Sequence, residues 1–231
     1  MAPATGAAPA ISEQKKMDQL NGEDTQRAFD RLFETELAPR LRQDGWEVRL
    51  EDPPQAYLHL SKPAWGDQRM NGIHFETYVL RTQLRTRAAP VALHCENGCA
   101  YRADFLRICT ERLKSPDGAG GLLAERLLLP PVEVRGRADT VDLPVLDVDE
   151  EDKQRKIQTP NQVDQRRDLP CTYEIGDPAS GDCSVIEVQV PFDGLTAAET
   201  VQRLAEQLDR FQTVLTPLVD ETIQACKINR A

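Results

Sequence analysis

The sequence predicts an α+β protein, a two-layer sandwich in which a mainly antiparallel sheet of four to five strands carries helices on one face. Four segments between residues 46 and 96 alternate apolar and polar residues, as half-buried strands do. The connections between them contain the Pro, Gly and Asn residues that turns require, which favours antiparallel pairing. Amphipathic helical patterns precede and follow these segments, and helices that flank one antiparallel sheet form a two-layer sandwich.

The composition is that of a globular protein with one substantial core. The chain has 231 residues, of which 40% are hydrophobic and 29% are charged. Residues 1–22 are rich in small and polar residues, so we expect a flexible tail there and a single α+β domain over residues 23–231. Residues from about 136 to 182 are charged and show no apolar period, which predicts a polar insertion within that domain.

The first helical pattern begins near residue 24. Its apolar residues fall on one helical face: Phe29, Leu32, Phe33, Leu37 and Leu41. Pro39 has no N–H donor and its ring clashes with the preceding turn, so we expect the helix to bend or end close to this residue.

The four alternating segments are WEVRLE (46–51), AYLHLS (56–61), GIHFETYVL (72–80) and VALHCE (91–96). Between the third and fourth, RTQLRTR is interpreted as a solvated hairpin loop, with a small anion-contacting loop as the alternative. A fifth segment, CSVIEVQVPFDG (183–194), predicts a strand with Val185, Glu187 and Gln189 pointing outward and its other apolar residues pointing inward.

Two further helices are predicted. The first begins near Ala100 and carries an apolar stripe as far as Leu113. The second begins with a capping box formed by Thr196 and Glu199. Its apolar seam comprises Val201, Leu204, Leu208, Phe211, Leu215 and Leu218. Pro217 is expected to interrupt this helix and to begin a separate one.

Charge and hydropathy restrict the classes of partner. The net charge of −10 and pI of about 4.9 disfavour nucleic acid, because an acidic surface repels the phosphate backbone. No apolar run reaches the roughly 18 residues that a membrane span requires, so no membrane partner is expected. The start of the chain does not resemble a secretory signal, and the six cysteines are expected to be reduced in the cytoplasm.

The outward face of the predicted sheet gathers the ionisable residues of the strands. Alternation places all three histidines of the chain on this face, each in a different strand. The candidate binding face comprises Tyr57, His59, His74, Glu76, Tyr78, His94 and Glu96. It includes two His-x-Glu pairs, whose members point the same way because strand side chains repeat every two residues.

Two functional hypotheses follow from this face. The favoured one is a non-enzymatic intracellular interaction module, adaptor- or chaperone-like and without a cofactor, whose partner is another protein or a second copy in a homodimer. Small acidic α+β secretion chaperones are similar to it in general shape. The alternative is a metal-dependent or acid–base enzyme, with a divalent metal held by His74, Glu76, His94 and Glu96.

Cys95 and Cys99 offer a third hypothesis, a zinc or redox switch, because their spacing matches one half of a zinc site. A second close pair of cysteines is missing from the sequence, and Cys95 falls on the predicted apolar face.

GDQRMNGIHFETYVL is similar to part of the core of PD-(D/E)xK nucleases. That resemblance implies Asp67 and Glu76 as metal carboxylates, but Tyr78 stands where the family has its lysine. The resemblance therefore implies, at most, an inactive relative.

Overall fold

The computed structural model describes residues 22–66, 72–116, 120–134 and 167–228. The chain forms an α+β fold around one antiparallel sheet of six strands, so the predicted fold class is confirmed with one strand more than expected. A separate two-stranded sheet pairs β5 (Val132–Val134) with β6 (Arg167–Leu169). Of the predicted tail, residues 1–21 lie outside the described residues.

The large sheet has the strand order β1-β2-β3-β4-β8-β7. The first four strands follow one another in a meander: β1 (Glu47–Leu50), β2 (Tyr57–Ser61), β3 (Ile73–Tyr78) and β4 (Ala88–Cys95). Strand β8 (Ser184–Pro191) pairs with β4, and β7 (Thr172–Ile175) pairs with β8 at the edge. The register places Leu60, Phe75 and Leu93 side by side on the apolar face.

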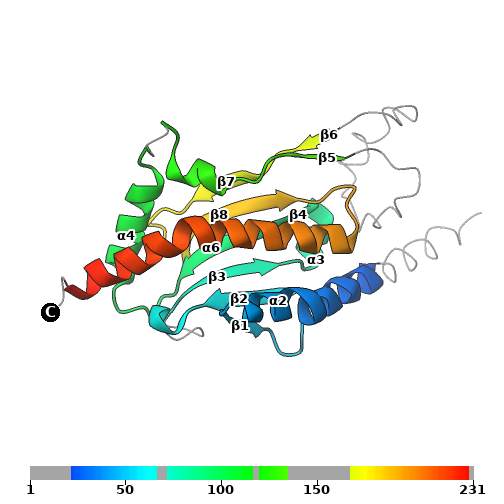
Figure 1. The fold of residues 1–231 in the computed structure, drawn as a ribbon, viewed down its shortest axis with the longest axis horizontal. Coiled ribbons are helices and arrows are strands. Elements are labelled where there is room, and N and C mark those ends of the chain that lie inside the picture. The colour runs from blue at the N-terminus through cyan, green and yellow to red at the C-terminus, as the bar shows by residue number, and fades with distance from the viewer. Residues whose placement is uncertain (1–21, 67–71, 117–119, 135–166, 229–231) are drawn as a thin grey trace, which may run out of the picture.

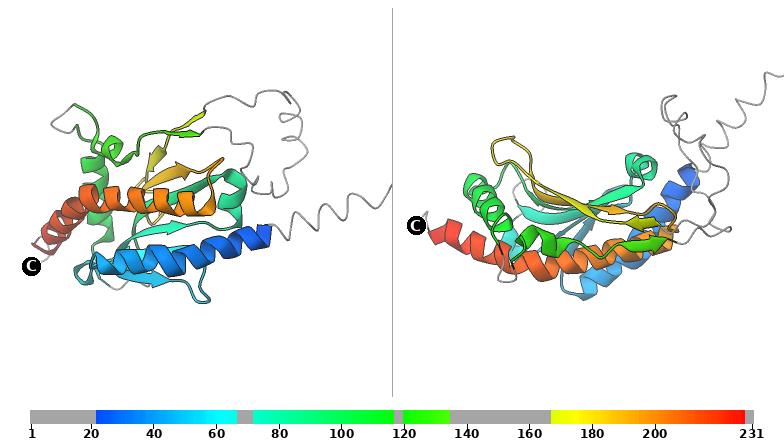
Figure 2. Two further views of the ribbon diagram at one scale, coloured as in Figure 1. Left: turned by 45° about the vertical axis from the view of Figure 1, so that its right-hand side comes forward. Right: turned by 90° about the horizontal axis from the view of Figure 1, so that it is seen from above.

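One face of this sheet is covered by two long helical segments (Figures 1 and 2). The N-terminal segment comprises helical residues 22–32, the π-helix η1 (Phe33–Leu37) and α2 (Ala38–Gln43). The C-terminal helix α6 (Ala197–Ile228) crosses the sheet beside it, and α4 (Arg102–Leu113) packs near its C-terminal half. The middle of the opposite face carries no helix among the described residues (Figure 2).

The core lies between these helices and the sheet. Phe211 of α6 packs edge-on against Phe75 of β3, with ring centroids 5.8 Å apart. Trp65, in the short helix η2 (Pro63–Trp65), lies 5.3 Å from the ring of Phe75 and is fully buried. The apolar seam of α6 is buried throughout, so this seam serves the core. Among the described residues, Ile228 is the one large hydrophobic side chain that is exposed.

Both prolines expected to disturb helices are accommodated without ending them. Helix α6 continues through Pro217, contrary to the predicted break, because Leu215, Leu218 and Val219 on either side are held in the core. At Pro39 the chain widens into the π-helix just before it, where the Ala38 N–H donates to the Phe33 carbonyl. The predicted bend near Pro39 is therefore a local widening of the helix.

Three local predictions differ from the structure. RTQLRTR forms the short helix α3 (Arg81–Thr86) instead of a solvated loop, because Leu84 is buried and Arg87 ends the helix in a left-handed conformation. Val185 is buried, not outward, because a register shift in the β4–β8 pairing opposes His94 with Ser184. Strands β6 and β7 lie within the predicted insertion of about 136–182, whose residues 135–166 are outside the described residues.

Candidate functional site

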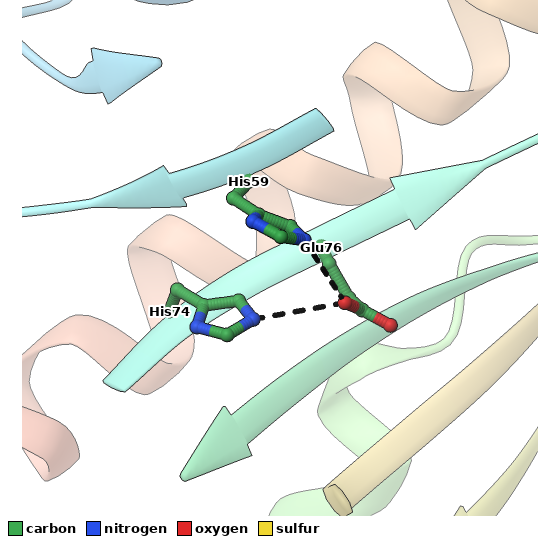
Figure 3. A group of neighbouring side chains, drawn as sticks. All are labelled: His59, His74 and Glu76. Carbon is green, nitrogen blue, oxygen red and sulfur yellow. Dashed lines mark ion pairs between the residues drawn. The ribbon is translucent and has the colours of Figure 1, made fainter. Parts of the chain in front are cut away.

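The three histidines of the chain converge on the uncovered face of the sheet. His59 lies on β2, His74 on β3 and His94 on β4, and all three approach the carboxylate of Glu76 on β3. The Nε2 atoms of His59 and His74 lie 3.5 and 3.6 Å from Glu76 Oε2, as Figure 3 shows. His94 Nε2 lies 3.5 Å from Glu76 Oε1 on the other side of the carboxylate.

Strand register explains this convergence. In the antiparallel ladders His59 is opposite Glu76, and His74 is opposite His94. Directly opposed residues on one face have Cβ atoms about 5 Å apart, so each pair is brought into contact by backbone pairing alone. The imidazole centroids of His59 and His74 are 4.5 Å apart, and those of His74 and His94 are 5.6 Å apart.

The inner members of the cluster are buried although they are polar. The side chain of His74 is 1% exposed and that of Glu76 is 6% exposed. Neither ring nitrogen of His74, nor Nε2 of His59, has a hydrogen-bond partner within the described part of the chain. Burying a polar atom without a partner costs about 1–3 kcal/mol. A ligand bound to these nitrogens would offset that cost.

The distances in the cluster fit metal coordination better than direct hydrogen bonding. An N–H···O hydrogen bond normally measures about 2.7–3.2 Å between heavy atoms. Two nitrogen or oxygen ligands of a tetrahedral zinc ion, each about 2.0–2.1 Å from the metal, lie about 3.4 Å from each other. The N···O separations of 3.5–3.6 Å in the cluster are close to the second value.

Two overlapping groups of residues bring potential metal-ligating atoms close together. The inner group is His59, His74 and Glu76, and the outer group is His74, His94 and Glu96. Within each group the potential ligand atoms lie within 4.8 Å of one another. In the outer group, His74 Nε2 lies 3.6 Å from Glu96 Oε1. Both groups approach the same Nε2 atom of His74, and one nitrogen binds one ion, so the arrangement suits a single metal ion.

The ionisation states of the cluster favour cation binding. Burial acts to raise the pKa of Glu76, but the three imidazoles and the Tyr57 hydroxyl outweigh it and hold this pKa well below its usual range. Burial lowers the pKa of His94, with Glu76 acting in the opposite direction. A carboxylate and a neutral imidazole are the forms that bind a metal.

Tyr57 and Tyr78 border the cluster. The Tyr57 hydroxyl donates a hydrogen bond to Glu76 Oε2 at 2.8 Å. Its ring packs edge-on against Tyr78, with centroids 5.0 Å apart. Burial, together with the charge of Glu76, raises the pKa of Tyr57, so the hydroxyl remains a donor. The seven residues of the predicted binding face therefore lie in one region of the sheet.

The structure separates Cys95 from this site and brings in Cys183. Cys95 is fully buried on the apolar side. A hydrogen bond with the free thiol of Cys99, together with burial, raises the pKa of Cys95. Neither Cys95 nor Cys99 belongs to a candidate metal group among the described residues. Cys183 donates to Glu96 Oε2 at 3.7 Å. No sequence pattern associates Cys183 with Glu96, since 87 positions separate them and their contact depends on the strand order.

Comparison of the chain with protein-family models, with curated proteins and with solved structures finds no match. The family resemblance to PD-(D/E)xK nucleases gains no support from these comparisons, and Asp67 lies outside the described residues. No helix among the described residues is both long and apolar enough to cross a membrane.

Proposed function

We propose that this protein binds one divalent transition-metal ion on the uncovered face of its sheet and uses it as a Lewis acid, as a metal-dependent enzyme. The observation that carries the proposal is His74, a buried imidazole with no hydrogen-bond partner among the described residues, placed 3.6 Å from both Glu76 and Glu96. Histidine and carboxylate are ligands that zinc and its neighbours accept readily.

The chemistry follows from the number of ligands. Each candidate group supplies three protein ligands, and a tetrahedral ion with three protein ligands keeps one position for water or substrate. Such an ion lowers the pKa of bound water and polarises a carbonyl or phosphoryl oxygen. The reaction class that this arrangement supports is hydrolysis at such a centre.

Metal titration of the protein, purified without a histidine tag, tests the proposal. We expect one zinc ion per chain by calorimetry and elemental analysis, and loss of binding in His74→Ala. Glu174→Gln is the matched control, because Glu174 lies on an outer strand of the same sheet and is exposed. Absence of stoichiometric binding by a folded protein would refute the metal centre.

A second candidate function is the interaction module, adaptor- or chaperone-like, that the polar face suggests. It is favoured by the absence of a helix over the middle of this face among the described residues (Figure 2). In this proposal the protein is cytoplasmic and its partner is another protein or a second copy of the chain. Light scattering at micromolar concentration tests the homodimer, and a strictly monomeric protein would remove it.

A further inference from the structure

We propose that the substrates of this site are uncharged carbonyl compounds that carry an N–H group, such as carboxamides, and that phosphate esters are excluded. This inference rests on the proposed metal centre and selects one of the two classes of oxygen that such an ion polarises. The structural reason is the negative charge beside the open position of the ion, above all the carboxylate of Glu76.

Glu76 lies beside both imidazoles of the outer group, His74, His94 and Glu96, without being a member of that group. Its Oε2 lies 3.6 Å from His74 Nε2, and its Oε1 lies 3.5 Å from His94 Nε2. A metal ion about 2.1 Å from either nitrogen would have an oxygen of Glu76 within about 5.7 Å. At that separation Glu76 can contact a molecule bound at the fourth position of the ion.

Tyr57 holds Glu76 in place as a hydrogen-bond acceptor. The Tyr57 hydroxyl donates to Glu76 Oε2 at 2.8 Å, which makes the inner group the poorer metal site. Oε1, on the side of His94, accepts no hydrogen bond from the described residues. An ionised carboxylate only accepts hydrogen bonds, so it favours a ligand that donates one. An amide offers both its carbonyl oxygen to the ion and its N–H to Glu76.

Further carboxylates extend the negative charge along the same row of the sheet. The register aligns Glu76 with Ala92 on β4, and Ala92 with Glu187 on β8. Glu187 is in turn opposite Glu174 on β7, and like charges in such a pair repel each other. Burial raises the pKa of Glu187, and the charges of Glu76 and Glu174 act in the same direction. An anionic substrate would meet this repulsion as well.

Cations that could balance a phosphate group are scarce on this face. Arg49 is the one Arg or Lys that the described strands of the large sheet place on it, and it lies on the edge strand β1, two strands from Glu76. Arg102 lies near the end of β4, but its guanidinium donates to two backbone carbonyls at 3.2 and 3.0 Å. Proteins recognise phosphate mainly through Arg, Lys and backbone N–H donors, so this face is poorly suited to it.

His74 is the independent indication that a ligand binds between these carboxylates. Its side chain is 1% exposed, and neither ring nitrogen has a hydrogen-bond partner in the described part of the chain. Its Nε2 lies 3.6 Å from both Glu76 and Glu96. A metal ion bound by His74 and Glu96 would occupy this nitrogen and leave Glu76 to contact the substrate.

Cobalt(II) bound to the metal-free protein tests this inference, because its visible d–d bands change when an outside molecule binds to the ion. The probes are acetohydroxamic acid, an uncharged carbonyl compound with N–H and O–H groups, and inorganic phosphate. We expect acetohydroxamic acid to bind at least about 10-fold more tightly than phosphate, because a carboxylate beside the open position repels an anion.

Two substitutions assign the preference to the carboxylates. Glu76→Gln keeps the size of the side chain and removes its charge, so phosphate should bind at least about 10-fold more tightly than to the native protein. Glu187→Gln should strengthen phosphate binding by a smaller factor, and it provides a second test if Glu76→Gln does not fold. Glu221→Gln is the control, because Glu221 is exposed on α6, which covers the opposite face of the sheet.

The outcomes distinguish this inference from the metal centre on which it rests. No cobalt spectrum in a protein with native circular dichroism would overturn both. A cobalt spectrum that responds to phosphate at least as readily as to acetohydroxamic acid, or to neither probe, would overturn the substrate class and leave the metal centre in place. Unchanged phosphate binding in the folded Glu76→Gln and Glu187→Gln variants would likewise overturn the role of these carboxylates.

Discussion

His74 Nε2 lies 3.6 Å from Oε2 of Glu76, two residues further along the same strand, in a position where the imidazole is 1% exposed. A buried imidazole and a buried carboxylate at this distance are too far apart for a good direct hydrogen bond. The spacing is close to that of two ligands around one metal ion.

Substitution of His59 and His94 distinguishes the two metal positions. His94→Ala should abolish stoichiometric zinc binding, because His94 belongs to the outer group, and in the inner group Glu76 Oε2 already accepts the Tyr57 hydrogen bond. His59→Ala should keep one zinc per chain, since His59 belongs to the inner group alone. Calorimetry with zinc measures both. The reverse pattern, with binding lost in His59→Ala and kept in His94→Ala, would place the ion in the inner group.

Ionisation of Cys109 should lower stability at alkaline pH. Burial raises the pKa of Cys109 to about 12, whereas in an unfolded chain it is about 8.5. The thiol therefore stabilises the fold fully below about pH 8.5, and this contribution is lost as pH rises toward the folded pKa, by at most about 1.4 kcal/mol per pH unit. Urea unfolding of the native protein and Cys109→Ala from pH 7.5 to 10.5 should show a gap in unfolding free energy that narrows as pH rises. A constant gap would contradict the prediction.

The Trp65–Asp220 hydrogen bond should contribute measurably to stability. Trp65 is fully buried and its Nε1–H donates to Asp220 Oδ1 at 2.7 Å. Asp220→Ala leaves this indole N–H without its acceptor, and we expect the free energy of unfolding to fall by about 1–2 kcal/mol in urea titration. Glu221→Ala is the control, because the ion pair of Glu221 with Arg112 is exposed and should contribute less than about 0.5 kcal/mol. Equal effects of the two substitutions would show that the indole hydrogen bond contributes no more to the free energy of unfolding than the exposed ion pair does.

Replacement of Pro217 should stabilise the protein. Pro217 lies inside α6 and is exposed, so the helix tolerates a residue that removes one backbone hydrogen bond and strains the preceding turn. Pro217→Ala should raise the free energy of unfolding by about 1–3 kcal/mol. The greater conformational entropy of the unfolded chain without this proline reduces the gain. Gln224→Ala, an exposed change in the same helix, should alter it by less than about 0.5 kcal/mol. A lower free energy of unfolding in Pro217→Ala would contradict this prediction and show that Pro217 itself stabilises the folded protein.

Much of the sheet was accessible to prediction because its signal is local. The alternation in β1, β2, β3, β4 and β8 depends on which residues can be buried, so it identified both the strands and the face that carries the histidines. The choice of face followed directly, since side chains on a strand repeat every two residues. The capping box at Thr196 and Glu199 is confirmed for the same reason, with the Glu199 N–H donating to Thr196 Oγ1 at 3.2 Å.

The remaining features depend on contacts between distant segments. The position of β8 between β4 and β7 is set by tertiary packing, and it determines that Cys183 meets Glu96. The sequence predicts His59 on the binding face but not among the metal ligands, because no glutamate follows it two residues along its strand. Its pairing with Glu76 depends on the β2–β3 register. At Pro217 a strong local rule was overridden by buried neighbours on the same helix.

The ladder that aligns β2, β3 and β4 makes the histidine site sensitive to one kind of genetic change and tolerant of another. Lengthening the connections between these strands leaves His59, Glu76, His74 and His94 opposite their present partners. Inserting or deleting one residue within β3 would turn every following side chain to the other face of the sheet, sending an imidazole or a carboxylate into the core and an aliphatic residue to the surface. Indels in a lineage that retains the site should therefore fall in the loops and spare the interior of these three strands.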